Sequence, residues 1–150
     1  MMSPQETFEV LAKQAKEELE ALTEAIARKR ATREQASRQL ESLRGYQQDY
    51  AQMLQTEMTQ GIVSAQCRTY QGFINALGGV ISQQETSLAQ IDLDITQHQT
   101  LWQKSYRKCQ SLEALMNRQR QKQAVHARRL DQKLSDEQAA RLSAKSRVIH

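Results

Sequence analysis

Residues that interrupt helices are almost absent from this chain. Its 150 residues include one proline and five glycines, and the proline, Pro4, stands where a helix can begin. Alanine, leucine, glutamine, glutamate, lysine and arginine dominate the composition, and all of them lose little side-chain freedom in a helix. The chain is therefore predicted to form long helices.

Two short stretches predict where the helices begin and where the chain turns. The sequence "SPQE" at residues 3–6 combines a serine cap, a proline at the first helical position and a glutamate at the third, as in a capping box. In "TQGIVSAQ" at 59–66, Gly61 can take the left-handed conformation that ends a helix, and Ser64 can cap the next one. We expect helices over about 4–59 and about 65–140, with a turn near residues 60–64.

A heptad repeat of apolar residues runs along both predicted helices. In the first helix it comprises Phe8, Ala12, Ala15, Leu19, Leu22, Ile26, Ala36, Leu40, Leu43, Tyr50 and Leu54; in the second it comprises Ile74, Leu77, Ile81, Leu88, Ile91, Ile95, Trp102, Cys109, Leu112 and Met116. Antiparallel pairing gives partners whose residue numbers add up to 124, such as Tyr50 with Ile74. The midpoint, residue 62, lies in the predicted turn. The fold class is therefore all-α: one domain over 1–150 that forms an antiparallel two-helix coiled-coil hairpin with arms of roughly 75 Å.

Polar residues interrupt this seam near its middle. Lys29 and Arg33 fall opposite Ile95 and Ile91, and His98 falls opposite Ile26. Long cationic side chains can lay their aliphatic stems on an apolar seam and keep their charged ends in water. We interpret this stretch as a weak part of the hairpin, and His98 as a tolerated polar residue and not a ligand.

The basic charge of the chain is concentrated after Met116, where the first helix has no residues left for pairing. This C-terminal overhang, residues 117–150, carries Arg118, Arg120, Lys122, Arg128, Arg129, Lys133, Arg141, Lys145 and Arg147. Such a run is either a solvated face or a basic helix that binds an acidic surface. Aromatic residues do not alternate with these cations as base-stacking platforms would, so a nucleic-acid-binding coiled coil is a minor alternative.

Patterns that carry catalysis or cofactor binding are missing from the sequence. There is no glycine-rich phosphate loop, no cysteine and histidine cluster at metal-ligand spacing, and no apolar window of about 18 residues for a membrane span. The N-terminal residues have neither the basic patch nor the apolar run of a signal peptide. We expect a cytoplasmic protein with no enzymatic activity, cofactor, metal site or small-molecule substrate.

Residues around the predicted turn resemble those of a known family. The turn "GIVSA", the flanking "YQQDY" and "TYQGFI" and the later "LDQK" are similar to the flagellar FliJ family. The resemblance implies a stalk of the flagellar type III export apparatus. Its terminal end would bind the hexameric export ATPase and promote ring assembly, and the rod would bind the cytoplasmic domain of the FlhA export gate. It also implies recycling of export chaperones, and a peripheral location on the cytoplasmic face of the inner membrane at the flagellar base.

The resemblance places the partner-binding residues as well. The gate would bind Gln39, Leu43, Tyr46, Tyr50, Phe73, Leu77, Val80 and Gln84. The candidates for ATPase binding are Arg118, Arg120, Lys122, Arg128, Arg129 and Lys133. Four gate candidates (Leu43, Tyr50, Leu77 and Gln84) are seam positions that should face the partner helix. Tyr46, placed opposite Gly78 by the pairing, and Phe73 lie beside the seam, and we expect these two to dock.

Two other classes stay open on the residues alone. The stalk of a virulence type III secretion system would share this architecture. An export chaperone would need an exposed apolar groove for its client protein.

Overall fold

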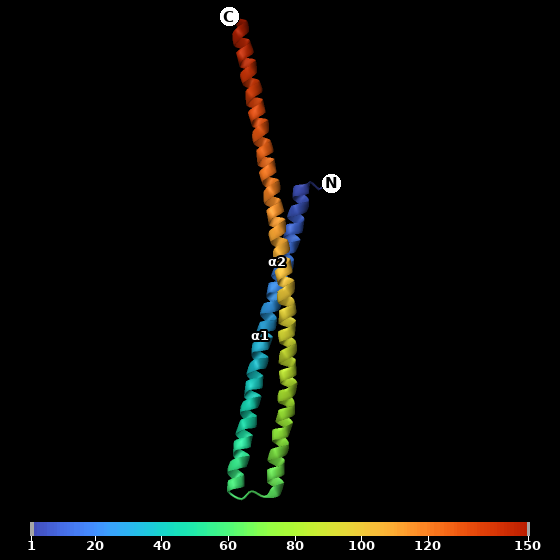
Figure 1. Ribbon diagram of the computed structural model, residues 1–150, viewed down its shortest axis with the longest axis vertical. Coiled ribbons are helices and arrows are strands. Elements are labelled where there is room, and N and C mark those ends of the chain that lie inside the picture. Colours follow the sequence, from blue (N-terminus) through green and yellow to red (C-terminus); the bar gives the residue numbers. More distant parts are fainter. Residues whose placement is uncertain (1, 150) are drawn as a thin grey trace. The chain divides into compact units, whose positions relative to one another are not determined.

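Two long helices make up the computed structural model, which describes residues 2–149. Helix α1 spans Pro4–Thr59 and α2 spans Ser64–Ile149, past the predicted end near residue 140 (Figure 1). This confirms the predicted all-α helical hairpin. Neither described helix contains an apolar stretch that could cross a membrane.

The described residues divide into two compact units. Unit 1 contains the residues up to Leu19 and those from Lys104 onward, and unit 2 is Glu20–Gln103. Each unit is considered by itself below. The prediction of one domain over residues 1–150 stays a prediction.

The capping box at the start of α1, in unit 1, forms as predicted. The backbone N of Ser3 donates to Glu6 Oε2 at 3.1 Å, and the backbone N of Glu6 donates to Ser3 Oγ at 3.2 Å. These bonds satisfy amides that have no acceptor within the first turn of a helix. The helix therefore begins where the short motif placed it.

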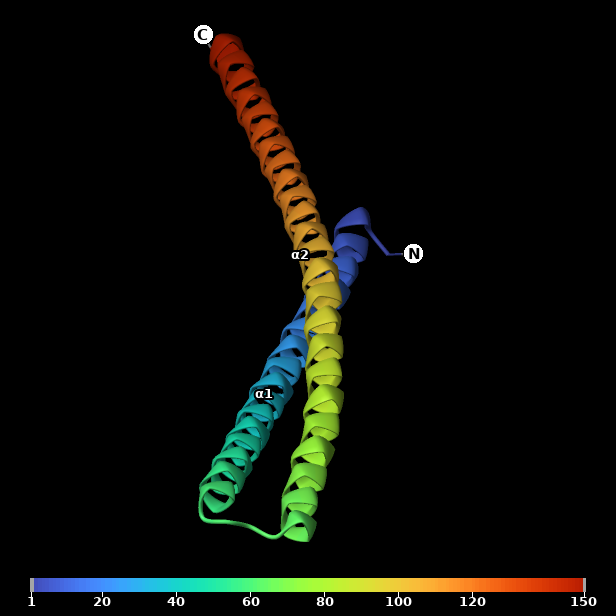
Figure 2. The same ribbon diagram turned by 60° about the horizontal axis from the view of Figure 1, so that its bottom comes forward.

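The turn in unit 2 depends on one glycine with a left-handed backbone. Gly61 has φ 86°, and its N donates to the carbonyl of Met58 at 3.3 Å while the N of Ile62 donates to the carbonyl of Glu57 at 3.1 Å. This pair of bonds is the Schellman motif, which satisfies the last carbonyls of a helix. A short connection then leads into α2 (Figure 2). The carbonyl of Val63 accepts the first bond of α2, so the cap falls one residue before the predicted Ser64.

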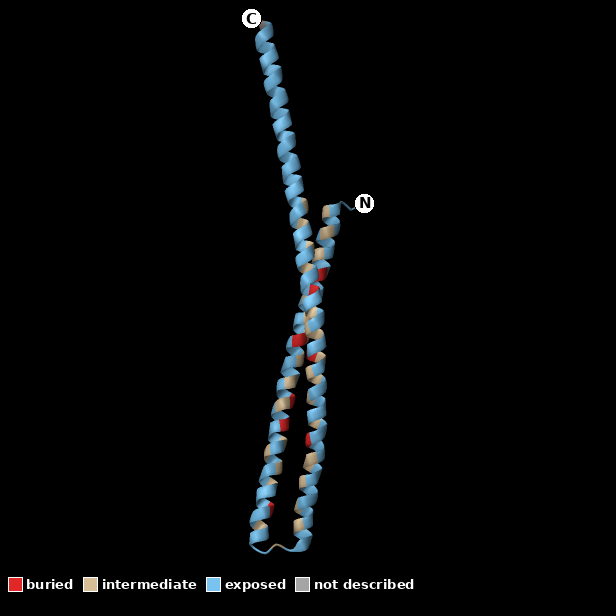
Figure 3. Cartoon of the chain, in the orientation of Figure 1, coloured by how far each residue is buried: buried red, intermediate tan, exposed pale blue. Residues whose placement is uncertain are grey.

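In unit 2 the helices pack along the predicted seam. Every predicted seam position between residues 20 and 103 is buried or half-buried. The buried residues of this unit are Ile26, Ala36, Leu40, Leu54, Ile81 and Ile95, and Figure 3 marks buried positions in red on both arms. Cross-helix pairs such as Lys29 with Asp94 and Arg33 with Asp92 have residue numbers that add up to nearly 124. The structure therefore pairs the two helices in the register that the heptads predict.

In unit 1 the first turns of α1 pack on the middle of α2. Ala15 is fully buried there, Ser105 is buried as well, and Lys108 Nζ lies 3.7 Å from Glu18 Oε2. From residue 120 to residue 148 every side chain of α2 is exposed (Figure 3). These residues make up most of the overhang. Apart from Arg120, which borders a groove shared with α1, they have no packed partner within unit 1.

Candidate partner-binding surfaces

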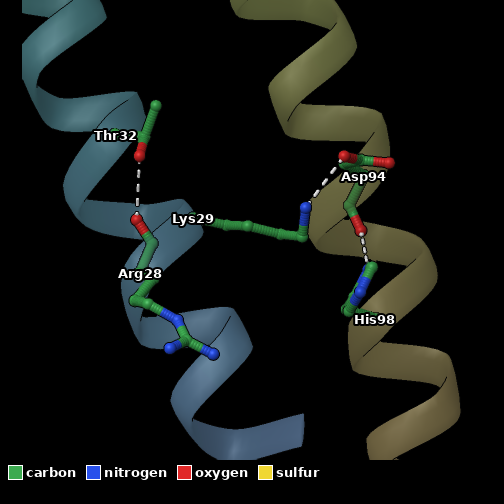
Figure 4. A network of polar contacts seen from close by, with 5 residues as sticks. All are labelled: Arg28, Lys29, Thr32, Asp94 and His98. Atoms are coloured by element: carbon green, nitrogen blue, oxygen red, sulfur yellow. Dashed lines mark hydrogen bonds and ion pairs between the residues drawn. The ribbon is translucent and has the colours of Figure 1, made fainter.

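A layer of charged residues crosses the seam in the half of unit 2 that lies away from the turn. Figure 4 shows Lys29 extending from α1 to Asp94 on α2, where Nζ and Oδ2 are 3.0 Å apart. Arg33 makes a second ion pair with Asp92, whose hydrogen bond and negative charge raise the pKa of Arg33 above its ordinary value. Nδ1 of His98 lies 2.9 Å from the carbonyl O of Asp94. The seam cations are therefore neutralised within the hairpin, which favours this register because a slip would leave them unpaired.

The eight predicted gate-binding residues divide into two sets of four. Leu43, Tyr50, Leu77 and Gln84 are half-buried in the seam, as their heptad positions predict, whereas Gln39, Tyr46, Phe73 and Val80 are exposed. Each exposed residue comes one position before a seam residue, which turns it by about 100° from the seam. Because α2 runs opposite to α1, the same offset on both helices points to the same side of the hairpin. We call Gln39, Tyr46, Phe73 and Val80 the Tyr46 face.

Two aromatic side chains dominate the Tyr46 face. Tyr46 is 57% exposed and Phe73 is 47% exposed. The Phe73 ring packs against the Tyr50 ring in the seam, with ring centroids 4.6 Å apart. The ring centroids of Tyr50 and Tyr70 are 6.4 Å apart. The hydroxyl of Tyr70 donates to Glu57 Oε1 at 3.0 Å, which raises the pKa of Tyr70. Phe73 is thus held in place by the Tyr50 ring on one side, and about half of its surface is exposed to solvent.

Tyr46 does not lie against Gly78, so that prediction was wrong. The side-chain atom nearest to a Cβ on Gly78 would be Gln47 Nε2, at 3.3 Å, and this amide donates to the carbonyl of Ile74 at 3.2 Å. Gly78 follows its seam residue whereas Tyr46 precedes its own, so the two lie on opposite sides of the seam. The sum of 124 therefore gives the position of a pair along the hairpin, but it does not give the side of the seam on which each residue lies.

The six candidate ATPase-binding residues lie on the overhang of unit 1. All of them are exposed, and none makes an ion pair with another described residue. Arg128 Nε donates to the carbonyl of Ala124 one turn earlier, at 3.4 Å. The positive charge of this stretch is therefore not neutralised within unit 1.

Comparison with known proteins establishes the family. A family model described as "Flagellar FliJ protein" matches residues 4–147. The chain belongs to the flagellar FliJ family. It is 30% identical over 140 residues to the flagellar FliJ protein of Salmonella typhi, a match that covers 93% of this chain and 95% of that protein. With the flagellar FliJ protein of Escherichia coli (strain K12) it shares 32% identity over 127 residues, or 85% and 86% of the two chains.

The family supports a role for this chain as a component of flagellar protein export. No solved structure gives a significant match to this FliJ-family chain.

Met53 adjoins the Tyr46 face of this FliJ-family chain and was missing from the predicted surface. It is 49% exposed and lies seven residues after Tyr46, one position before the seam residue Leu54. In a coiled coil every seventh residue recurs on the same side, so the heptad repeat contained this signal. The exposed apolar surface next to the turn is therefore longer than the predicted set.

Proposed function

We propose that this FliJ-family chain is a stalk of the flagellar export apparatus that binds two partners. The overhang binds the hexameric export ATPase, and the Tyr46 face binds the cytoplasmic domain of the FlhA export gate. In this role the protein works beside export chaperones at the cytoplasmic face of the inner membrane.

The gate-binding half of the proposal rests on the outward orientation of Tyr46 and Phe73. Other residues already fill the seam between the helices, so these two rings are not needed to close it. Tyrosine and phenylalanine provide large contact area for little loss of side-chain entropy, and aromatic residues are enriched in the energetic centres of protein interfaces. This surface suits a partner that binds reversibly.

The ATPase-binding half rests on the exposure and charge of residues 120–148. In proteins a helix gains most of its stability from tertiary contacts, and unit 1 leaves every side chain of this stretch exposed. Its unpaired cations attract an acidic surface. A helix of this kind suits insertion into, or docking on, a larger acidic partner.

The proposal is tested by pull-down of the cognate export ATPase with the full-length chain, followed by gel filtration and an ATPase assay. We expect co-purification, a shift of the ATPase toward hexamers and stimulated hydrolysis. Truncation after Met116 should abolish the stimulation, and stimulation that survives the truncation would exclude the overhang from this role. Restoration of motility in a deletion strain tests the flagellar assignment against a virulence system. Co-purification with a filament or hook subunit in place of the ATPase would favour an export chaperone.

A further inference from the structure

Four basic residues of the overhang lie along one side of α2. Arg118, Lys122, Arg129 and Lys133 follow one another at intervals of four, seven and four residues, and all are exposed. Because the helix has about 3.6 residues per turn, residues eleven apart return to nearly the same direction and residues four apart lie close beside it. We call these four residues the Lys122 stripe.

The first three residues of the stripe share one groove. Arg118, Lys122 and Arg129 line a shallow groove on α2, with Val125 and His126 between them. Val125 is exposed, so a partner that contacts the cations also contacts an apolar side chain. The groove therefore combines charge with a small apolar contact.

The other two candidate arginines point away from the stripe. Arg120 lies midway between Arg118 and Lys122, so it is rotated by about 200° from Arg118. Arg128 precedes Arg129 by one residue, a rotation of about 100°, and its Nε already donates to the carbonyl of Ala124. Of the six candidate residues, four thus share one side of the helix and two arginines lie off it.

We propose that the Lys122 stripe is the surface of the overhang that binds an acidic face of a protein partner, and that total positive charge alone is not sufficient. This inference rests on the proposed function, under which the partner is the export ATPase. The sole carboxylate between residues 118 and 133 is that of Asp131, which is two positions from Lys133 and points to the other side. Asp136 lies on the same side just beyond Lys133, where it accepts a hydrogen bond from Gln132 Nε2 at 3.1 Å. Between residues 118 and 133 the stripe has no carboxylate on its own side, and its arginines can form bidentate hydrogen bonds with carboxylates of a partner.

A protein partner fits this surface better than a nucleic acid does. The chain contains no Phe, Tyr or Trp after Tyr106, so the ring beside the stripe is the small imidazole of His126 and not one of the larger stacking platforms. The apolar contact offered by Val125 has its counterpart in a protein surface and not in a phosphate backbone. Duplex DNA nevertheless enters the test below, because cations alone bind phosphates.

Two double variants of the full-length chain test the stripe at equal charge. One is Lys122→Gln with Arg129→Gln, on the stripe; its control is Arg141→Gln with Lys145→Gln, which lie off the stripe and outside the candidate set for ATPase binding. Both remove two positive charges from exposed positions and keep good helix formers. We expect the stripe variant to raise the Kd for the cognate ATPase about tenfold or more, and the control to change it by less than about threefold. Helix content, measured by circular dichroism, should be equal in both.

Several outcomes would overturn the inference. Equal losses in the two variants would mean that overall charge decides binding. No loss in the stripe variant, together with abolished stimulation after truncation at Met116, would refute the stripe and leave the proposed function standing. No binding by the wild-type chain would refute both proposals. Stripe-dependent binding of duplex DNA at physiological salt, without binding of the ATPase, would assign the surface to nucleic acid.

Discussion

Truncation of the two rings on the Tyr46 face should separate partner binding from folding. Burying a large apolar side chain completely contributes about 1.5–3 kcal/mol to the free energy of unfolding. Tyr46 is 57% exposed, so we expect Tyr46→Ala to remove about 1 kcal/mol of burial. Phe73→Ala should remove a similar amount and, in addition, a ring contact with Tyr50 worth about 0.5–1.5 kcal/mol.

The higher helix propensity of alanine offsets about 0.5 kcal/mol at each of these two positions. The double variant Tyr46→Ala, Phe73→Ala should therefore lower the free energy of unfolding by about 2 kcal/mol. A single seam substitution, Leu40→Ala, should cost about 2–5 kcal/mol because Leu40 is 5% exposed and its loss leaves a cavity. One seam residue thus contributes at least as much to folding as both rings of the face.

The two rings should matter more for partner binding than for folding. If the two rings are the energetic centre of the gate interface, the double variant should weaken binding to the cytoplasmic domain of FlhA by at least about 2 kcal/mol, or about 30-fold in Kd. Isothermal titration calorimetry measures the affinity, and circular dichroism during denaturant unfolding measures the stability. Leu93→Ala is the matched control, because Leu93 is 51% exposed but lies two positions after the seam residue Ile91 and points away from the seam.

Two results would refute this reasoning. If the double variant lost its helical structure, the rings would belong to the core and not to a docking surface. If Leu93→Ala weakened binding as much as the double variant, the interface would not be confined to the Tyr46 face.

Three further substitutions test local features of the fold. Gly61→Ala should lower the free energy of unfolding by about 1–2 kcal/mol, because φ 86° disfavours a Cβ although no atom within 4 Å crowds it; denaturant unfolding measures this loss, and an unchanged midpoint would contradict it. Ser3→Ala should cost about 1 kcal/mol and speed amide hydrogen exchange at Glu6, whose N loses its acceptor; unaltered exchange would speak against the capping box. Tyr70 should ionise above its ordinary pKa of 10.0 in an ultraviolet titration, because its bond to Glu57 favours the neutral phenol. The stability linked to Tyr70 is therefore present below pH 10.0 and lost as pH rises through the folded pKa. Glu57→Gln should lower the pKa of Tyr70 toward the ordinary value, and an ordinary pKa in the wild type would contradict the bond.

Much of the hairpin could be predicted because its signals are local or periodic. The cap at Ser3, the left-handed glycine at Gly61 and the heptad seam each depend on a few neighbouring residues or on a constant spacing. The end of α2 was placed about nine residues too early because the apolar period fades there. The backbone hydrogen bonds of a helix need no apolar period, and no helix breaker occurs in this stretch.

The sequence by itself determined the helical class, the turn and the level at which the two helices pair, since all three follow from residue type and periodicity along one chain. Only the tertiary structure decided how far each residue beside the seam is exposed and which side chains it contacts. Exposure depends on how the antiparallel partner helix packs. Tyr46 and Phe73 each precede a seam residue and lie on one side of the hairpin, whereas Gly78 follows a seam residue and lies on the other. The structure likewise decided that Asp92 and Asp94 neutralise the seam cations, because charges far apart in sequence meet only when the helices pack.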